Sequence, residues 1–589
     1  MANRIFPCGS IRWISLFLLF PNVTPAGFAG QSREPHDTES PESRTDGAQD
    51  SSAAEPTVAQ ETPVRHFEPF PVRWFSPGRP VDGIEPFEYE INRVAEELNP
   101  YRQNMLKGDF PLPGTEDLFL NLIVTERFTY QVRELPTPSG ITGSSSVEPD
   151  FFGDPDQTLL INDVAVTVEL FKGQQAFMPV EWRIRVTPVF NFNVLDVEEV
   201  GVVKADVSKG TRREEADLSL QEAFVEYHLF DLSDRYDFVS VEAGVLPFRS
   251  DFRGFIFDDT NLGVRLLGNW DNNKWQYNLV YFDTLNKDTN SLLNEFTNRE
   301  QEVYIANLYR QDWPVLGYTT QFSFHYNHDD RGFHFDENGF LVSPAPIGRA
   351  QQNEIDAYYL GWTGEGHLGR INVTHALYQA LGEEDNNPFA ARDVDIDAQL
   401  AALELSYDID WLRLRVFGLY ASGDEDTRDG DAEGFDAIFD APNFAGGELS
   451  FFNSQAIRLL GVNLTNLGSP LPDLQSSKFE GQSNFVNPGI FQVGGALDFE
   501  LTPKWRGQVG GNYLHFVEVD PLEVYLEIPD IDREIGTELF VGTQYRPLLN
   551  NHVNILASLS GFWPGDGFER IYQSDSMLFA ATVTLQLTW

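Results

Sequence analysis

A two-residue alternation of apolar and polar side chains recurs from residue 115 to the C-terminus, and it constrains the fold more than any other feature. In the segment 182–193, Ile184 and Val186 fall on one face, while Arg183 and Arg185 fall on the other. The same alternation recurs in 412–416, 491–501, 553–559 and 579–589. It predicts strands that each have one apolar and one polar face.

A soluble β-sandwich also alternates, so the connections must decide which environment the apolar face meets. The pattern predicts about eighteen strands, an even number typical of bacterial outer-membrane barrels. Short and long connections alternate, as expected for periplasmic turns and extracellular loops. The short ones are 232–236, 269–274, 312–317, 363–369, 408–411, 502–505 and 547–551, and the long ones are 133–156, 197–215, 284–299, 329–352 and 422–484.

The tryptophans follow the same alternation. Eight of the eleven lie beside short connections or at the C-terminus: Trp182, Trp270, Trp275, Trp313, Trp362, Trp411, Trp505 and Trp589. Aromatic residues collect in this way where a barrel crosses a membrane interface. We therefore predict an all-β fold, a transmembrane antiparallel β-barrel of about eighteen strands in the bacterial outer membrane, over residues 115–589.

The N-terminal 114 residues have a different composition. Arg4 and Arg12 precede a short apolar run, and small residues follow it, so 1–29 reads as a secretory signal peptide. The segment 30–65 is rich in Ser, Glu, Asp, Pro and Thr and predicts a disordered periplasmic linker. In 66–114 aromatic residues return, and the apolar spacing of 87–98 predicts one short helix in a periplasmic segment.

Composition excludes several other classes. With 90 acidic and 41 basic residues the formal charge is −49, and no basic patch offers a surface for nucleic acid. The only cysteine, Cys8, falls in the predicted signal peptide, so the mature chain can form no internal disulfide. The sequence contains no Gly-x-Ser-x-Gly elbow, His-Glu-x-x-His motif or phosphate loop. We therefore do not expect an enzyme.

Three segments resemble known outer-membrane proteins. The strand 585–589 ends on Trp589 and resembles the C-terminal signal that the barrel assembly machinery recognises. The segment 245–265 resembles a strand-loop-strand unit of porin-like proteins, and 420–436 is similar to an acidic loop of the alginate-export barrel family. The latter resemblance implies an eighteen-stranded monomeric barrel whose basic lumen residues guide an anionic polysaccharide outward.

Polar faces of the predicted strands define the lumen. The candidate solute pathway carries both signs of charge, on Arg183, Arg185, Arg265, Arg370, Arg413, Arg415, Arg506, Glu222, Glu242, Glu404 and Asp498. Rings of one sign set charge selectivity, whereas mixed charges suit a general pore. The near balance favours passive diffusion of small polar or anionic solutes or oligosaccharides. Dedicated export of an anionic exopolysaccharide remains the alternative.

The acidic loop after residue 420 allows two interpretations. Asp424, Asp426, Asp429 and Asp431 supply oxygen ligands that suit Ca²⁺, but their spacing fails the EF-hand pattern. The other interpretation is a solvated loop bridged by divalent ions to lipopolysaccharide, which with membrane lipid is an expected partner. The long connection 422–484 contains Gly, Phe and Asn that permit, without requiring, a fold into the barrel.

Overall fold

The described part of the chain is residues 105–589. In this computed structural model, placements are given for that range except 138–151, 174–178, 236, 345–348, 350, 456–479 and 550, within which only the backbone of Arg458–Leu459 and Val462–Asn463 is described. The predicted signal peptide, the linker and the helix at 87–98 lie outside the described residues.

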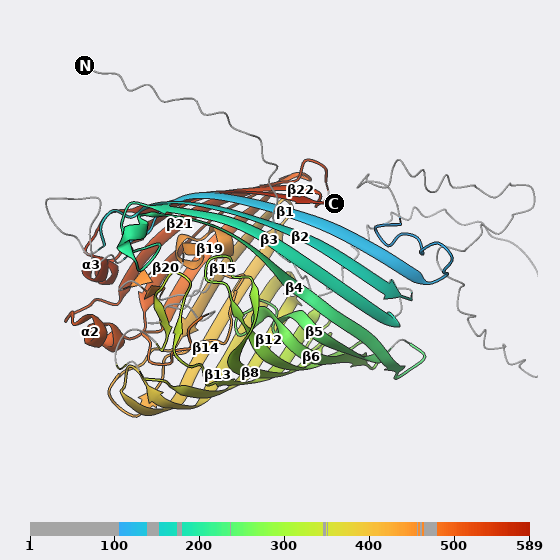
Figure 1. Ribbon diagram of the computed structural model, residues 1–589, viewed down its shortest axis with the longest axis horizontal. Helices are drawn as coiled ribbons and strands as arrows, with labels where there is room; N and C mark the ends of the chain where they lie inside the picture. Colours follow the sequence, from blue (N-terminus) through green and yellow to red (C-terminus); the bar gives the residue numbers. More distant parts are fainter. Residues whose placement is uncertain are drawn as a thin grey trace, which may run out of the picture. The chain divides into compact units, whose positions relative to one another are not determined.

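The described residues form a closed antiparallel barrel. One sheet contains nineteen strands, and without β16 (Asp431–Ala432), which pairs in parallel with β14, eighteen form the ring. The ring closes because the first strand pairs with the last, Thr125 opposite Thr588 and Arg133 opposite Ala580. Figure 1 shows this seam, with the blue β1 beside the red strands of the C-terminus. The predicted fold class and strand number are confirmed.

The strands of the ring follow chain order. They are β1 (Leu118–Glu134), β2 (Asp156–Lys172), β3 (Trp182–Val197), β4 (Arg212–Asp231), β5 (Phe238–Arg249), β6 (Asp258–Trp270), β7 (Trp275–Lys287), β8 (Asn294–Arg310), β9 (Tyr318–Asp329), β12 (Glu354–Leu368), β13 (Ile371–Asn387), β14 (Arg392–Ile409), β15 (Leu412–Ala421), β19 (Ile490–Thr502), β20 (Trp505–Phe516), β21 (Glu534–Tyr545), β22 (Val553–Pro564) and β23 (Leu578–Thr588).

The remaining elements are short and lie in connections. They are the strands β10 (His334–Phe335), β11 (Leu341–Ser343), β17 (Arg458–Leu459) and β18 (Val462–Asn463), the 3₁₀ turns η3 (Val207–Lys209) and η4 (Gly447–Leu449), and the helices α1 (Phe451–Gln455), α2 (Asp520–Leu526) and α3 (Asp566–Tyr572). Among the described residues, no helix is long and apolar enough to cross a bilayer.

The alternation in the sequence places apolar side chains on the outer wall. On β19, Phe491 and Val493 are each 42% exposed, whereas Gln492 between them is fully buried inside. Backbone hydrogen bonds pass from strand to strand around the ring, so the polar main-chain groups of paired residues are satisfied without water. A closed barrel with such an apolar outer face spans the bacterial outer membrane.

The two ends of the barrel differ in their connections. At one end the turns are short, down to two residues at 369–370, 410–411 and 503–504. At the other end lie the long connections, including 135–155, 330–353 and 422–489. The predicted long connection 284–299 shrinks to 288–293, because β7 and β8 continue their pairing through two irregularities.

Aromatic rows mark both ends of the outer wall. Eight of the nine tryptophans in the described residues lie at or toward the short-turn end, as predicted, and Trp563 lies at the other. Toward the long-loop end a row of cross-strand tyrosines crosses four strands: Tyr281 opposite Tyr304, Tyr304 opposite Tyr326, and Tyr326 opposite Tyr358. Tyrosine and tryptophan favour the two membrane interfaces because each ring combines an apolar body with a polar edge.

Candidate functional site

Strand alternation decides which charged side chains face the barrel interior. On β3, Ile184 and Val186 are 40% and 38% exposed on the outer wall. Arg183 and Arg185 point the opposite way, toward buried carboxylates of β2, β4 and β5. The sequence therefore assigned these side chains to the correct face.

A first cluster of interior charges lies on β2 to β6, and we call it the first wall cluster. Its members are Arg183, Arg185, Arg265, Glu169, Glu222, Glu226 and Glu242. Arg185 Nε donates to Glu169 Oε2 at 2.7 Å, and Arg265 Nη1 lies 3.0 Å from Glu242 Oε2. Each arginine thus has an ion-pair partner on an adjacent or nearby strand.

A second cluster lies on β14, β15 and β19 and on an inward loop, and we call it the second wall cluster. Its members are Arg253, Arg413, Arg415, Glu404, Asp408 and Asp498. Arg415 Nη2 lies 3.0 Å from Asp498 Oδ1, and its Nη1 lies 3.5 Å from Glu404 Oε2. Arg253 reaches the same Glu404 from the connection between β5 and β6, at 3.2 Å.

The two wall clusters face each other across the barrel. In chain order β14 lies eight strands on from β4 in the ring of eighteen, close to half way round. The first cluster has three arginines against four glutamates, and the second has three arginines against three acids. Each wall is therefore nearly balanced, and neither forms the ring of one sign that selects strongly for one charge.

Two of the predicted pathway arginines lie apart from the clusters. Arg370 occupies the short turn between β12 and β13, where its guanidinium lies 5.2 Å from the centre of the Tyr407 ring. Arg506, near the start of β20, pairs with Glu500 at 2.7 Å, and both side chains are about half exposed. These contacts place both residues near the short-turn mouth.

The long connection between β15 and β19 folds into the barrel, which decides the question that the sequence left open. In its described parts, 422–455 and 480–489, the phenylalanines at 435, 439, 451 and 485 are at most 1% exposed. They belong to the same apolar cluster as inward residues of the wall such as Phe248 and Phe282. The interior is thus narrowed by an apolar core.

Polar contacts fix this connection to two separate parts of the wall, β21 on one side and the paired strands β9 and β12 on the other. Ser450 Oγ and Phe452 N donate to the carboxylate of Glu538 on β21, at 2.5 and 2.9 Å. Tyr359 OH on β12 donates to the Asp436 carbonyl at 3.1 Å. Gln482 Nε2 donates to Asp329 Oδ1 on β9 at 3.2 Å. The connection therefore spans the interior instead of lying along one side.

The connection between β5 and β6, residues 250–257, also turns inward. The Ser250 carbonyl accepts from Asn307 Nδ2 at 2.7 Å and from Gln321 Nε2 at 2.5 Å. Phe257 and Phe439 form an isolated parallel bridge with their rings 5.8 Å apart, so the two inward connections pack on each other.

Sequence reasoning missed this internal core because it treated the inner surface as uniformly polar. A signal was present in the density of apolar residues within connections that were expected to be solvated. Phe435, Ile438, Phe439 and Phe444 fall within ten residues of one another, and Phe451 and Phe452 follow soon after. A solvated loop has no reason to carry so many large apolar side chains.

The predicted calcium ligands lie in this same connection but do not converge. Asp426 Oδ1 accepts from the Arg428 amide, and Asp429 Oδ1 accepts from the Asp431 amide, in local turns. Asp424 is 1% exposed, and its Oδ1 accepts from the Glu433 amide at 3.2 Å. Calcium binding by these aspartates stays a prediction.

Elsewhere in the described residues, two groups of side chains bring ligand atoms within 4.8 Å of one another. One is His328, Glu354 and Asp356, and the other is Asp288, Glu295 and Glu337. The first group stands on the outer wall, two residues beyond the tyrosine row, since His328 and Asp356 follow Tyr326 and precede Tyr358. Neither group was singled out in the sequence.

Comparison with known proteins gives likenesses to solved barrels only. No family model matches the chain, and no curated protein matches it. OccAB1 of Acinetobacter baumannii matches at 9% identity over 83% of this chain and 99% of that chain, with a TM-score of 0.46. OpdQ of Pseudomonas aeruginosa matches at 11% identity over 80% and 98%, with a TM-score of 0.42, and OccK11 of the same organism at 10% over 80% and 95%, with 0.41.

At identities of 9–11% and TM-scores below 0.5, these likenesses assign the chain to no family. The barrel is instead established by the strand pairing of this chain itself. The resemblance to the alginate-export family likewise stays a prediction.

Proposed function

We propose that the protein is a passive outer-membrane channel for small polar or anionic solutes, including oligosaccharides. The observation that carries this proposal is the pair of mixed-charge wall clusters facing each other inside a closed barrel. Alternating acids and bases offer partners to either end of a polar solute without holding one charge strongly. Inward connections narrow the interior and limit the size of the solute.

Dedicated export of an anionic exopolysaccharide requires basic side chains that can grip carboxylates in forked pairs. In the two wall clusters each arginine already has a carboxylate within 4.0 Å. A polysaccharide would have to displace those internal partners. This pairing favours the general channel over the export channel.

Charge reversal on both walls tests the channel proposal. Arg185→Glu combined with Arg415→Glu leaves buried acids without partners, so the interior becomes strongly negative. We expect the cation-to-anion permeability ratio in planar bilayers to rise by about fivefold, from roughly 1 kcal/mol of Coulomb energy. Arg212→Glu is the matched control, since Arg212 begins β4 at the long-loop end, on the outer face, and its side chain is 57% exposed.

An unchanged ratio in the double variant would contradict the assignment of these walls to the pathway. The same bilayers distinguish the two transport hypotheses. Equal block of conductance by neutral and uronate oligosaccharides supports the general channel. Block by uronate oligosaccharides alone supports the alginate-type export channel.

A further inference from the structure

The barrel wall has a break beside β4. Strand β4 pairs with β3 along nearly its whole length, up to Arg212 opposite Asp196. It pairs with β5 only over residues 223–231, because the last residues of β5, 246–249, pair with β6 and leave β4. Among the described residues, no strand pairs with the second edge of residues 212–222.

The part of this free edge from Leu218 to Leu220 lies within the apolar band of the outer wall. Leu218 is 74% exposed and pairs with Phe190, which is 41% exposed on the lipid-facing side of β3. Leu220 pairs with the outward Pro188 in the same way. Since unpaired backbone groups are costly against hydrocarbon, an edge at this level favours a bound partner.

The connection between β7 and β8, residues 288–293, closes the break from the inside. Leu293 is 8% exposed and packs with Ala165 and Val189 on the inner faces of β2 and β3. Ser219 Oγ on the free edge donates to the Asn294 carbonyl at the start of β8. The break is therefore a hollow that is closed on the side of the barrel interior and open on the side of the membrane.

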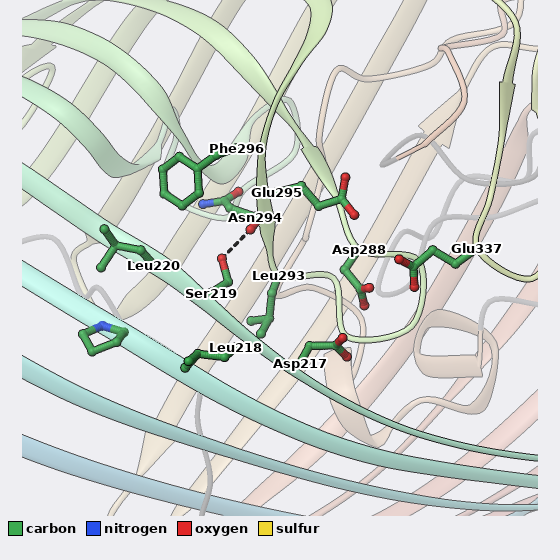
Figure 2. A pocket seen from close by; sticks show the side chains of 11 residues that line it. Asp217, Leu218, Ser219, Leu220, Asp288, Leu293, Asn294, Glu295, Phe296 and Glu337 are labelled. Carbon is green, nitrogen blue, oxygen red and sulfur yellow. Dashed lines mark hydrogen bonds between the residues drawn. The ribbon is translucent and has the colours of Figure 1, made fainter.

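A cavity of about 480 Å³ occupies this hollow. Figure 2 shows its two kinds of lining, with Leu218, Leu220 and Phe296 on one side and acidic side chains on the other. Phe296 is 63% exposed, so the apolar side is continuous with the outer wall. The cavity thus joins an apolar surface to a charged one.

Three carboxylates form the charged side. Ligand oxygens of Asp288, Glu295 and Glu337 all lie within 4.8 Å of one another. No Lys or Arg in the described part of the chain forms a direct ion pair with any of them; Arg213 and Arg331 attract Asp288 and Glu295 only at longer range, and Asp217 adds a fourth acid to the lining. Partial burial of the carboxyl, a hydrogen bond to Asp288 and neighbouring acids raise the pKa of Glu337 to about 7. Such crowding favours a bound positive charge.

A buried amide also lines the cavity without a partner for its nitrogen. Asn294 is 3% exposed and lines the cavity, and its Oδ1 accepts from Lys287 Nζ at 2.6 Å. Its Nδ2 has no hydrogen-bond partner among the described residues, and neither has Oδ2 of Asp217. A buried donor left unpaired costs about 1–3 kcal/mol, so its presence here points to a ligand that completes the site.

We propose that this membrane-facing cavity binds a cationic amphiphile of the outer leaflet. Its ammonium head lies among Asp288, Glu295 and Glu337, and its alkyl chain lies along Leu218, Leu220 and Phe296. A polar group next to the head accepts from Asn294 Nδ2. A divalent cation alone satisfies only the carboxylates and leaves the apolar half of the cavity unused.

Binding of dodecylammonium to the full-length protein in phosphatidylcholine nanodiscs tests this site, with EDTA present and empty nanodiscs as the blank. We expect saturable binding that weakens by about fivefold in Glu337→Gln, from the loss of one charge pair. Glu337 is exposed in a loop, so this variant should fold. The matched control is Glu300→Gln, an exposed acid of β8 outside the cavity lining, which should bind as the wild type does.

Two further probes examine the two halves of the cavity. Phe296→Ala should weaken dodecylammonium binding and leave the weaker binding of ethylammonium unchanged. Equal saturable binding of dodecanoate would overturn the assignment of the head group, and so would equal binding by wild type and Glu337→Gln. Saturable binding of ⁴⁵Ca²⁺ that Glu337→Gln abolishes, with no saturable dodecylammonium binding, would make this a metal site and overturn the proposal.

Discussion

The buried charged side chains of the two wall clusters are stabilised by ion pairs with side chains of opposite charge. Glu169 is 1% exposed, and Arg185 beside it has a side chain that is 25% exposed. Removing water from both ions is costly, and their mutual attraction offsets that cost only while both remain. The strand pattern could predict that these side chains face inward. It could not predict which arginine forms an ion pair with which acid, because the partners lie on different strands whose register the sequence does not reveal.

Asp424 is a buried carboxyl without this kind of partner. Its burial, with Asp429, Glu433 and Asp520 nearby, raises the pKa to about 7, although the Glu433 amide lowers it. The folded state therefore binds the proton more tightly than the unfolded state, whose pKa is near 4. Stability from this group is present below about pH 4 and is lost as the pH rises to about 7.

Asp424→Asn should accordingly protect the loop at high pH. In EDTA at pH 8, we expect hydrogen exchange of residues 424–436 to be about tenfold slower in the variant than in the wild type, and equal at pH 4. The calcium hypothesis predicts the opposite sign: with Ca²⁺ at pH 8, the variant would exchange faster because it lacks a ligand. Identical exchange under all these conditions would contradict both.

The inward connection between β15 and β19 is the element that most distinguishes the observed interior from the polar interior that the sequence predicted. Its phenylalanines form a core with wall residues, and Glu538 receives two hydrogen bonds from it. The strands could be predicted because lipid imposes a strict two-residue period on them. The path of the connection could not, since its contacts depend on which parts of the wall stand opposite each other.

Glu538→Ala should loosen this connection without breaking the barrel. It leaves Ser450 Oγ and the Phe452 amide without their acceptor, at a cost of about 1–3 kcal/mol each. We expect a larger and noisier single-channel conductance in planar bilayers. Glu500→Ala removes an acid from a half-exposed pair near the short turns and should leave the conductance unchanged. Unaltered conductance in Glu538→Ala would show that this anchor does not limit the pathway.

The barrel as a whole depends on one seam between its two ends. The amide of Trp589 donates to the Val124 carbonyl at 2.8 Å, and the amide of Val124 donates back to the Trp589 carbonyl at 3.2 Å. The sequence predicted an assembly signal here from the resemblance of the strand 585–589, which ends on Trp589. Recognition by the barrel assembly machinery stays a prediction, and the structure adds that the same residue forms part of the seam.

Deletion of Trp589 separates the assembly signal from the seam when the variant is compared in cells and in detergent. We expect less of the heat-modifiable, folded form in outer membranes, because the seam and the predicted signal are both shortened. Trp589→Phe restores the commoner terminal residue and keeps the backbone contacts, so it should assemble normally. Refolding into detergent, where no assembly machinery acts, reports the seam alone. Normal assembly of the deletion variant in cells would contradict the signal hypothesis.

The seam also sets an order of events during folding. β1 and β23 meet across 455 residues of sequence at Thr129 and Thr584, so the ring can close only after the whole chain has arrived. The connection inside it contacts β1 as well, through Arg133 Nη1 and Gln455 Oε1 at 3.2 Å. A closed cylinder offers no way in for a folded core from the side. We therefore expect the core to assemble while the barrel is still an open sheet.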